Sequence, residues 1–146
     1  MNIFGKKNDL SSISRINFEN VNDFTRGNKY PDALLINTLP KSEQHFLISK
    51  TLLINEEVDR INELLSTGQK NAVIFIYGKN SHDNTIYAKY EQLCNLGFTN
   101  CHVYDGGMFE WLLLQDVYGL DEFPTTNTPS NCCLDYIPSK KIIKLK

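Results

Sequence analysis

A polar segment, residues 78–85, separates an apolar run from an amphipathic one. It places an amine, a hydroxyl, an imidazole and a carboxylate within a few residues of one another. In open α/β folds the ligand site lies beyond the carboxyl ends of the strands, and a polar loop directly after a buried strand occupies that place. We therefore predict a ligand-binding site made of the loop residues Gly78, Lys79, Asn80, Ser81, His82, Asp83, Asn84 and Thr85.

Two chemistries and one plain alternative are open to this loop. Backbone N–H groups that converge at a helix start favour a small anion, which Lys79 supports and Asp83 opposes. An imidazole such as that of His82 can act as a base or nucleophile at neutral pH, but only the adjacent Asp83 is available to orient it. Catalysis needs several groups in mutual geometry, so we assign no catalytic residue. The alternative is a solvated connector whose polar side chains cap the following helix.

The four cysteines of the chain lack the C-x-x-C spacing of a metal site. Cys94 falls on the apolar stripe of a predicted helix, so we expect it in the core, and Cys101 opens a predicted strand. Cys132 and Cys133 are a vicinal pair with no neighbouring cation that would lower a thiol pKa. This pattern is typical of a protein in a reducing compartment.

The composition is that of one ordinary globular domain, with 146 residues, 41% hydrophobic and 22% charged. A net charge of -2 offers no basic surface for a phosphate backbone, so we expect no nucleic-acid partner. No run reaches the roughly 18 apolar residues of a membrane span, so we expect no membrane and a cytoplasmic location. His45 and His102 share no ligand spacing, and we expect neither metal nor cofactor.

Short apolar runs alternate along the chain with amphipathic segments. The runs predict strands over residues 14–18, 33–37, 51–54, 73–76 and 101–104, and the amphipathic segments predict helices over 19–25, 55–68, 86–96 and 108–118. Such alternation favours a parallel sheet with right-handed crossovers. The expected fold is a three-layer α/β domain with a central parallel sheet of about five strands, an N-terminal arm at 1–12, the domain at 13–126 and a C-terminal tail at 127–146.

Local signals set the expected helix ends. Asn55 is expected to cap the second helix, with an apolar stripe at Val58, Ile61 and Leu65 and a stop at Gly68. In the third helix Asn84 or Thr85 is the expected cap, and Gly97 is the expected end.

The order of strand, glycine-capped helix and strand, followed by the run Gly-Gly-Met-Phe-Glu-Trp at 106–111, resembles the rhodanese-like domain, a small α/β sulfurtransferase module. The turn Leu96-Gly97-Phe98 belongs to the same resemblance, which extends over roughly residues 16–124. The run 104–126 also looks like a branch of the family from unicellular eukaryotes and large DNA viruses. This likeness implies a location in host cytoplasm or virion if the protein is viral.

The resemblance also identifies departures from the family pattern. The family carries a catalytic cysteine directly after the central strand, in a loop with a glycine and an arginine; Gly78 stands at the cysteine position, and Ser81 and Asp83 stand at the other two. Residues 37–39, Asn-Thr-Leu, stand for the usual Asp-Val-Arg, and residues 47–51 stand for the segment Gly-His-Ile-Pro-Gly-Ala. The resemblance therefore implies the scaffold without its nucleophile.

Two functions follow as hypotheses. The first is a catalytically inactive rhodanese-like domain, a pseudoenzyme that acts as a binding or scaffold module and recognises a protein partner or a small anion through residues 78–85. The alternative is a sulfurtransferase or phosphatase-like enzyme that uses a relocated cysteine such as Cys132 or Cys133. A thiol in the loop would favour the enzyme, and the loop contains none.

Overall fold

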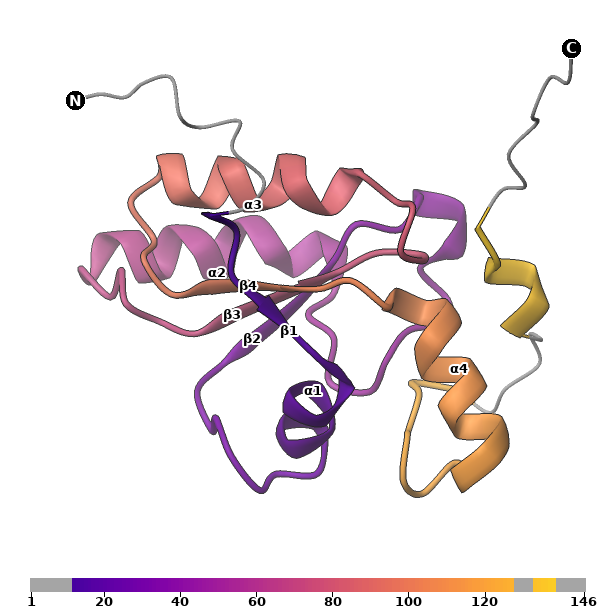
Figure 1. Ribbon diagram of the computed structural model, residues 1–146. Helices are drawn as coiled ribbons and strands as arrows, with labels where there is room; N and C mark the ends of the chain where they lie inside the picture. The colour runs from indigo at the N-terminus through magenta and orange to yellow at the C-terminus, as the bar shows by residue number, and fades with distance from the viewer. Residues whose placement is uncertain (1–11, 128–132, 139–146) are drawn as a thin grey trace, which may run out of the picture.

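A four-stranded parallel sheet forms the centre of the protein in the computed structural model, which describes residues 12–127 and 133–138 (Figure 1). The strand order is β1-β4-β3-β2. The strands are β1 (Arg15–Ile16), β2 (Leu34–Asn37), β3 (Ile74–Tyr77) and β4 (Cys101–Tyr104). The helices are α1 (Phe18–Thr25), α2 (Ile54–Ser66), α3 (Thr85–Asn95) and α4 (Gly107–Tyr118), with short 3-10 turns η3 (Lys41–Glu43) and η4 (Cys133–Tyr136).

Helices cover both faces of this sheet, so the fold has three layers as predicted (Figure 1). Ile74 and Ile76 of β3 belong to the cluster beneath α2 and α3, whereas Phe75 and Tyr77 belong to the cluster beneath α1 and α4. Successive side chains of a strand point to opposite faces, and here both faces are dry. This arrangement explains why the central strand is apolar without interruption.

One predicted strand is wrong. Residues 51–53 form no strand, and Ile54 already begins α2. A turn precedes this segment, in which Lys50 has a φ of 70° and the Thr51 N–H donates to the Ile48 carbonyl over 3.1 Å. The Leu52 N–H still donates to Leu35 O of β2 over 2.8 Å. The segment thus lies beside β2 without extending the sheet, which has four strands among the described residues instead of about five.

The start and the buried face of α2 also differ from the prediction. The N-cap is Leu53, so Asn55 lies inside the helix and does not cap it. Val58 is 66% exposed, and Ile61 and Leu64 are the buried positions. The predicted face was rotated because the sequence pattern does not identify which side chains meet the sheet.

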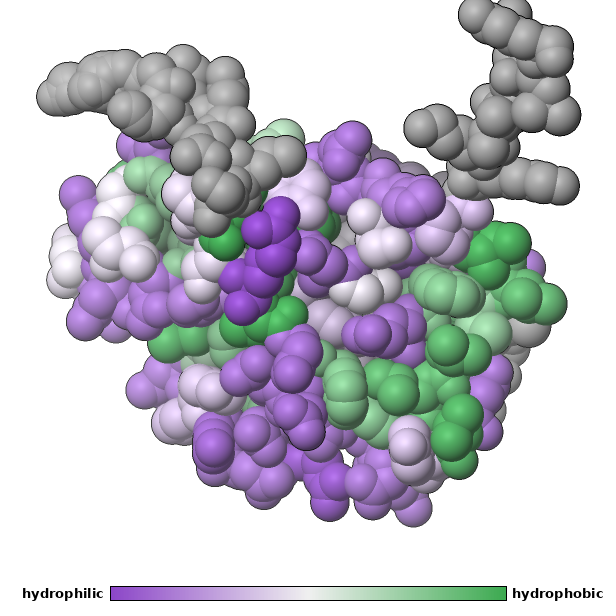
Figure 2. Space-filling view, in the orientation of Figure 1, coloured by the Kyte–Doolittle hydropathy of each residue, from purple (hydrophilic) through white to green (hydrophobic). Residues whose placement is uncertain are grey.

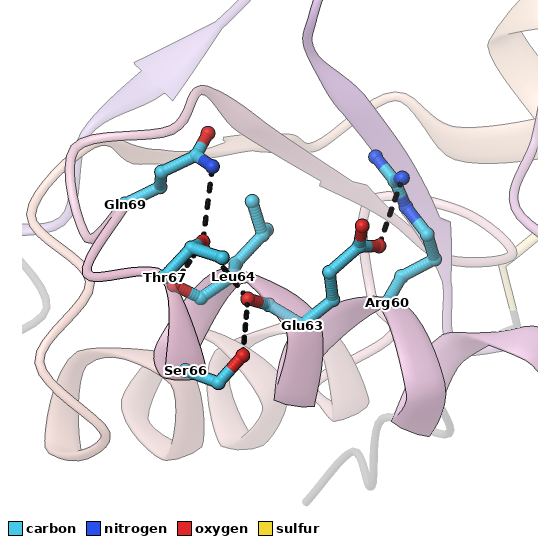
Figure 3. Close-up of polar contacts among 6 residues, drawn as sticks. All are labelled: Arg60, Glu63, Leu64, Ser66, Thr67 and Gln69. Carbon is cyan, nitrogen blue, oxygen red and sulfur yellow. Dashed lines mark hydrogen bonds and ion pairs between the residues drawn. The ribbon is translucent and has the colours of Figure 1, made fainter.

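The end of α2 at Gly68 is confirmed, with a φ of 75° that favours glycine. Figure 3 shows how this end satisfies its free carbonyl groups: the hydroxyls of Ser66 and Thr67 donate to the Glu63 carbonyl over 3.0 and 2.9 Å. Helix ends leave such carbonyls without intrahelical partners, so these side chains stabilise the last turn. Gly97 ends α3 in the same way as predicted, with a φ of 107°.

Cys94 is exposed, so its predicted core position is wrong, while Cys101, at the start of its predicted strand, is buried. Each residue turns an α-helix by about 100°, which places Cys94 well to one side of its neighbour Leu93, a buried residue of α3. Cys101 points from β4 into the cluster beneath α2 and α3. Burial raises the pKa of its thiol to about 12.

Trp111 is the anchor of α4. It is fully buried, its Nε1 donates to the Pro124 carbonyl over 3.0 Å, and its ring meets those of Tyr104 and Phe123 edge-on. The opposite side of α4 is also apolar, because Leu113 and Val117 are 44% and 67% exposed. Figure 2 shows hydrophobic surface gathered over this part of the molecule.

We expect Trp111→Ala to reduce the free energy of unfolding by about 3–5 kcal/mol, because it removes the largest core side chain and leaves a cavity. Trp111→Phe retains a ring and loses the hydrogen bond to Pro124, so its cost should be smaller. Urea denaturation followed by circular dichroism measures both. Equal stability of Trp111→Ala and the wild type would contradict the burial of this residue.

Candidate functional site

The predicted loop connects β3 to α3 at the carboxyl end of the sheet. The start of α4 holds its first residues, because the N–H groups of Met108 and Phe109 donate to the carbonyls of Gly78 and Lys79 over 3.0 and 2.9 Å. Gly107 makes this approach possible. A Cβ atom on Gly107 would stand 2.5 Å from the Gly78 carbonyl oxygen, so only glycine fits there.

The Asp83 carboxylate lies at the centre of the loop. It accepts hydrogen bonds from the N–H groups of Lys79 and Thr85 over 2.9 and 3.0 Å, and from the Thr85 hydroxyl over 2.5 Å. Asn84 holds the N-cap position of α3, one of the two positions predicted, but its side chain makes no hydrogen bond to the start of the helix. Asp83 supplies the side-chain cap instead. Its negative charge interacts favourably with the positive end of the helix dipole at the N-terminus of α3.

The same carboxylate occupies the space next to Gly78. A Cβ atom on Gly78 would lie 2.5 Å from Asp83 Oδ2 and 2.9 Å from Thr38 Oγ1. The Thr38 and Thr85 hydroxyl oxygens are 2.7 Å apart, so the two threonines and Asp83 form one connected group of contacts. A side chain at position 78 would therefore have to displace the Asp83 carboxylate and the Thr38 hydroxyl.

Two short 3-10 turns flank the loop. On one side, Glu43 of η3 lies 3.6 Å from the Lys79 ammonium. On the other side, Tyr136 of η4 places its ring 5.8 Å from that ammonium, and its carbonyl accepts from the Asn80 side chain over 2.9 Å. Asn80 is buried and also accepts from the His82 N–H over 2.9 Å. Asn80 thus joins the loop to the C-terminal turn.

The surface over the loop is an open depression of about 520 Å³. The structure brings together five of the predicted residues in its lining, while Gly78 is buried and Ser81 and Asn84 are exposed outside that lining. The lining residues are Thr38, Pro40, Lys79, Asn80, His82, Asp83 and Thr85.

Sequence reasoning missed Thr38, Glu43 and Tyr136 as parts of this site. Thr38 follows β2, and the carboxyl ends of neighbouring parallel strands meet at one edge, so its position after a predicted strand was a usable signal. Glu43 and Tyr136 belong to short turns whose placement depends on tertiary contacts, and no local pattern marks them.

None of the cysteines at described positions lines the depression. Cys133 is 7% exposed and packs in the cluster beneath α1 and α4, and Cys132 lies outside the described residues. Cys94 and Cys101 lie on α3 and β4, and burial is the main cause that raises the pKa of each thiol.

Comparison with protein families gives a match to the Rhodanese-like domain over residues 23–114. The chain therefore belongs to the rhodanese-like domain family. A comparison with curated proteins found no match. No helix among residues 12–127 and 133–138 is long and apolar enough to cross a membrane.

Solved structures of the Alr3790 protein from Anabaena sp. have a similar fold. A crystal structure of that protein aligns with a TM-score of 0.54 at 18% identity, over 77% of this chain and 82% of the other. A solution NMR structure of its rhodanese-like domain aligns with a TM-score of 0.54 at 17% identity, over 90% of this chain and 93% of the other. At this identity the likeness establishes the shared fold.

We expect Gly78→Ala to destabilise the protein by about 1–3 kcal/mol, because the added methyl group displaces the Asp83 carboxylate. In an Asp83→Ala background the same change should cost less, with a coupling of at least about 0.5 kcal/mol. Urea denaturation of the four proteins in the cycle measures this coupling. Asp116→Ala, at an exposed position on α4, is the matched control and should be additive with Gly78→Ala. Additivity of the Asp83 pair would show that the two positions do not compete.

Proposed function

We propose that this protein is a rhodanese-like domain without sulfurtransferase activity and that it acts by binding a protein partner. The observation that carries the proposal is the Asp83 carboxylate, which fills the space beside Gly78 and accepts the N–H groups of Lys79 and Thr85. By its sequence resemblance, Gly78 stands where the family carries its cysteine. Glycine has no thiolate to accept sulfur, and the neighbouring space is occupied.

The occupied loop favours a protein partner over a small anion. An anion at the start of α3 would compete with Asp83 for the same N–H donors and would meet its negative charge. Ser81 and His82 are exposed at the loop. A second depression shares Thr38 and Thr85 with the first, and Ile54 and Val58 are exposed in its lining. These exposed polar and apolar side chains are available for contact with a protein partner.

A second surface supports the same proposal. Leu113, Val117 and Tyr118 of α4 are all more than 40% exposed, although α4 is the most apolar helix of the chain. Exposed apolar side chains gathered on one helix are typical of a protein-binding surface.

We expect no transfer of sulfur from thiosulfate to cyanide above the uncatalysed rate, because the reaction needs a thiolate at the loop. A colorimetric thiocyanate assay with the wild type and with all four cysteines changed to serine measures this. Activity that disappears only with Cys132→Ser or Cys133→Ser would overturn the proposal and establish an enzyme with a relocated thiol.

Asp83→Asn should permit phosphate binding at the loop, because it removes the negative charge that repels an anion from the Lys79 and Thr85 N–H groups. NMR titration with inorganic phosphate should then give saturable amide shifts at residues 79–85 in the variant and none in the wild type. Asp116→Asn is the control for the change in net charge and should behave as the wild type. Saturable binding to the wild type would mean that Asp83 does not close the site.

A further inference from the structure

A second group of polar side chains lies at the amino end of the sheet, away from residues 78–85. Ser14 precedes β1, His102 is in β4, and Asn100 directly precedes β4. The pairing of β1 with β4 positions them: the Val103 N–H donates to the Ser14 carbonyl over 2.9 Å, and Arg15 is in register with Val103. Ser14 and His102 are 88 positions apart in the chain and meet only because these strands are neighbours.

The three side chains form a linear hydrogen-bonded series. The Ser14 hydroxyl oxygen is 2.6 Å from His102 Nδ1, and His102 Nε2 is 2.6 Å from the Asn100 side-chain oxygen. The Asn100 amide nitrogen donates to the Asn71 carbonyl over 3.3 Å, which orients its oxygen toward the imidazole. All three residues of the series are partly exposed.

This orientation determines which imidazole nitrogen carries the proton. The Asn100 oxygen can only accept, so His102 Nε2 must be the donor. Nδ1 of the neutral ring is then an acceptor, and the Ser14 hydroxyl donates its proton to it. A hydroxyl that donates to an imidazole held by a third group is the arrangement that activates a serine.

The surroundings keep the imidazole neutral. The His102 ring packs against Phe75 with centroids 6.1 Å apart. Burial lowers the pKa of His102, and a neutral imidazole can accept the serine proton at pH 7.

We propose that Ser14 is a nucleophile that accepts acyl groups from activated esters, with His102 as its general base and Asn100 as the positioning residue. The Ser14 oxygen forms a bond to the acyl carbon while its proton passes to His102 Nδ1. The bond from that carbon to the ester oxygen then breaks, and the alcohol or phenol leaves with the proton from His102. Water releases the acyl group in a second step that regenerates the hydroxyl.

The backbone N–H of Ser14 is the donor that we assign to the oxyanion of the reacting carbonyl. Among the described residues, the Ser14 N–H makes a long contact of 3.5 Å with the Tyr90 hydroxyl. In serine hydrolases the N–H of the nucleophile itself stabilises the oxyanion, and the Ser14 N–H has the same covalent relation to its hydroxyl.

The test uses p-nitrophenyl acetate as the probe, with the full chain. We expect release of p-nitrophenolate and an acetyl group on Ser14, located by peptide mass spectrometry. Ser14→Ala should abolish the modification, and His102→Gln should slow it by about 100-fold or more, the usual contribution of a general base. Ser42→Ala, an exposed serine on η3, is the matched control and should react as the wild type.

Asn100 variants separate activation from simple structural support. Asn100→Asp keeps an oxygen acceptor for His102 Nε2 and should retain the reaction. Asn100→Ala removes this acceptor and should slow the reaction. The melting temperatures of Asn100→Asp and Asn100→Ala should be similar. The proposal is overturned if the wild type carries no acetyl group on Ser14, or if His102→Gln, shown by NMR to be folded, reacts as fast as the wild type. In either case the series is only a set of structural hydrogen bonds. The sulfurtransfer and phosphate experiments address the other end of the sheet, so their outcomes are independent.

Discussion

The Asp83 carboxylate is the interaction on which the carboxyl end of the sheet depends. One side chain caps α3, accepts the Lys79 N–H and fills the space beside Gly78. A helix start with free N–H groups next to a buried strand would otherwise need an external anion or water. In this loop the Asp83 carboxylate supplies that acceptor from within the chain.

The close contact of α4 with this loop adds a second constraint. Gly107 allows the α4 N–H groups to reach the Gly78 and Lys79 carbonyls, and Trp111 anchors the same helix in the core. Gly107 and Trp111 of the run 106–111 thus have a structural role in holding α4 against the loop and the core.

The two ends of the sheet have opposite chemical character. At the carboxyl end a carboxylate satisfies the N–H groups of the loop. At the amino end a neutral imidazole holds a serine hydroxyl, and neither residue is fully buried. A polar group that is already satisfied is suited to structure or binding, whereas a hydroxyl that donates to a base retains a nucleophilic lone pair. The chemistry that we propose for Ser14 therefore lies at the end of the sheet opposite to residues 78–85.

The sequence alone determined the layers, the ends of α2 and α3 at Gly68 and Gly97, and the place of the loop, because apolar periodicity and glycine conformation are local properties. It did not determine that Asp83 lies against Gly78, that residues 51–53 turn away from the sheet, or that Cys94 is exposed. Those outcomes depend on which faces of the helices, strands and loops pack against one another in the folded protein. The contact of Ser14 with His102 has the same origin: strand order joins residues 88 positions apart, and only the tertiary structure sets strand order.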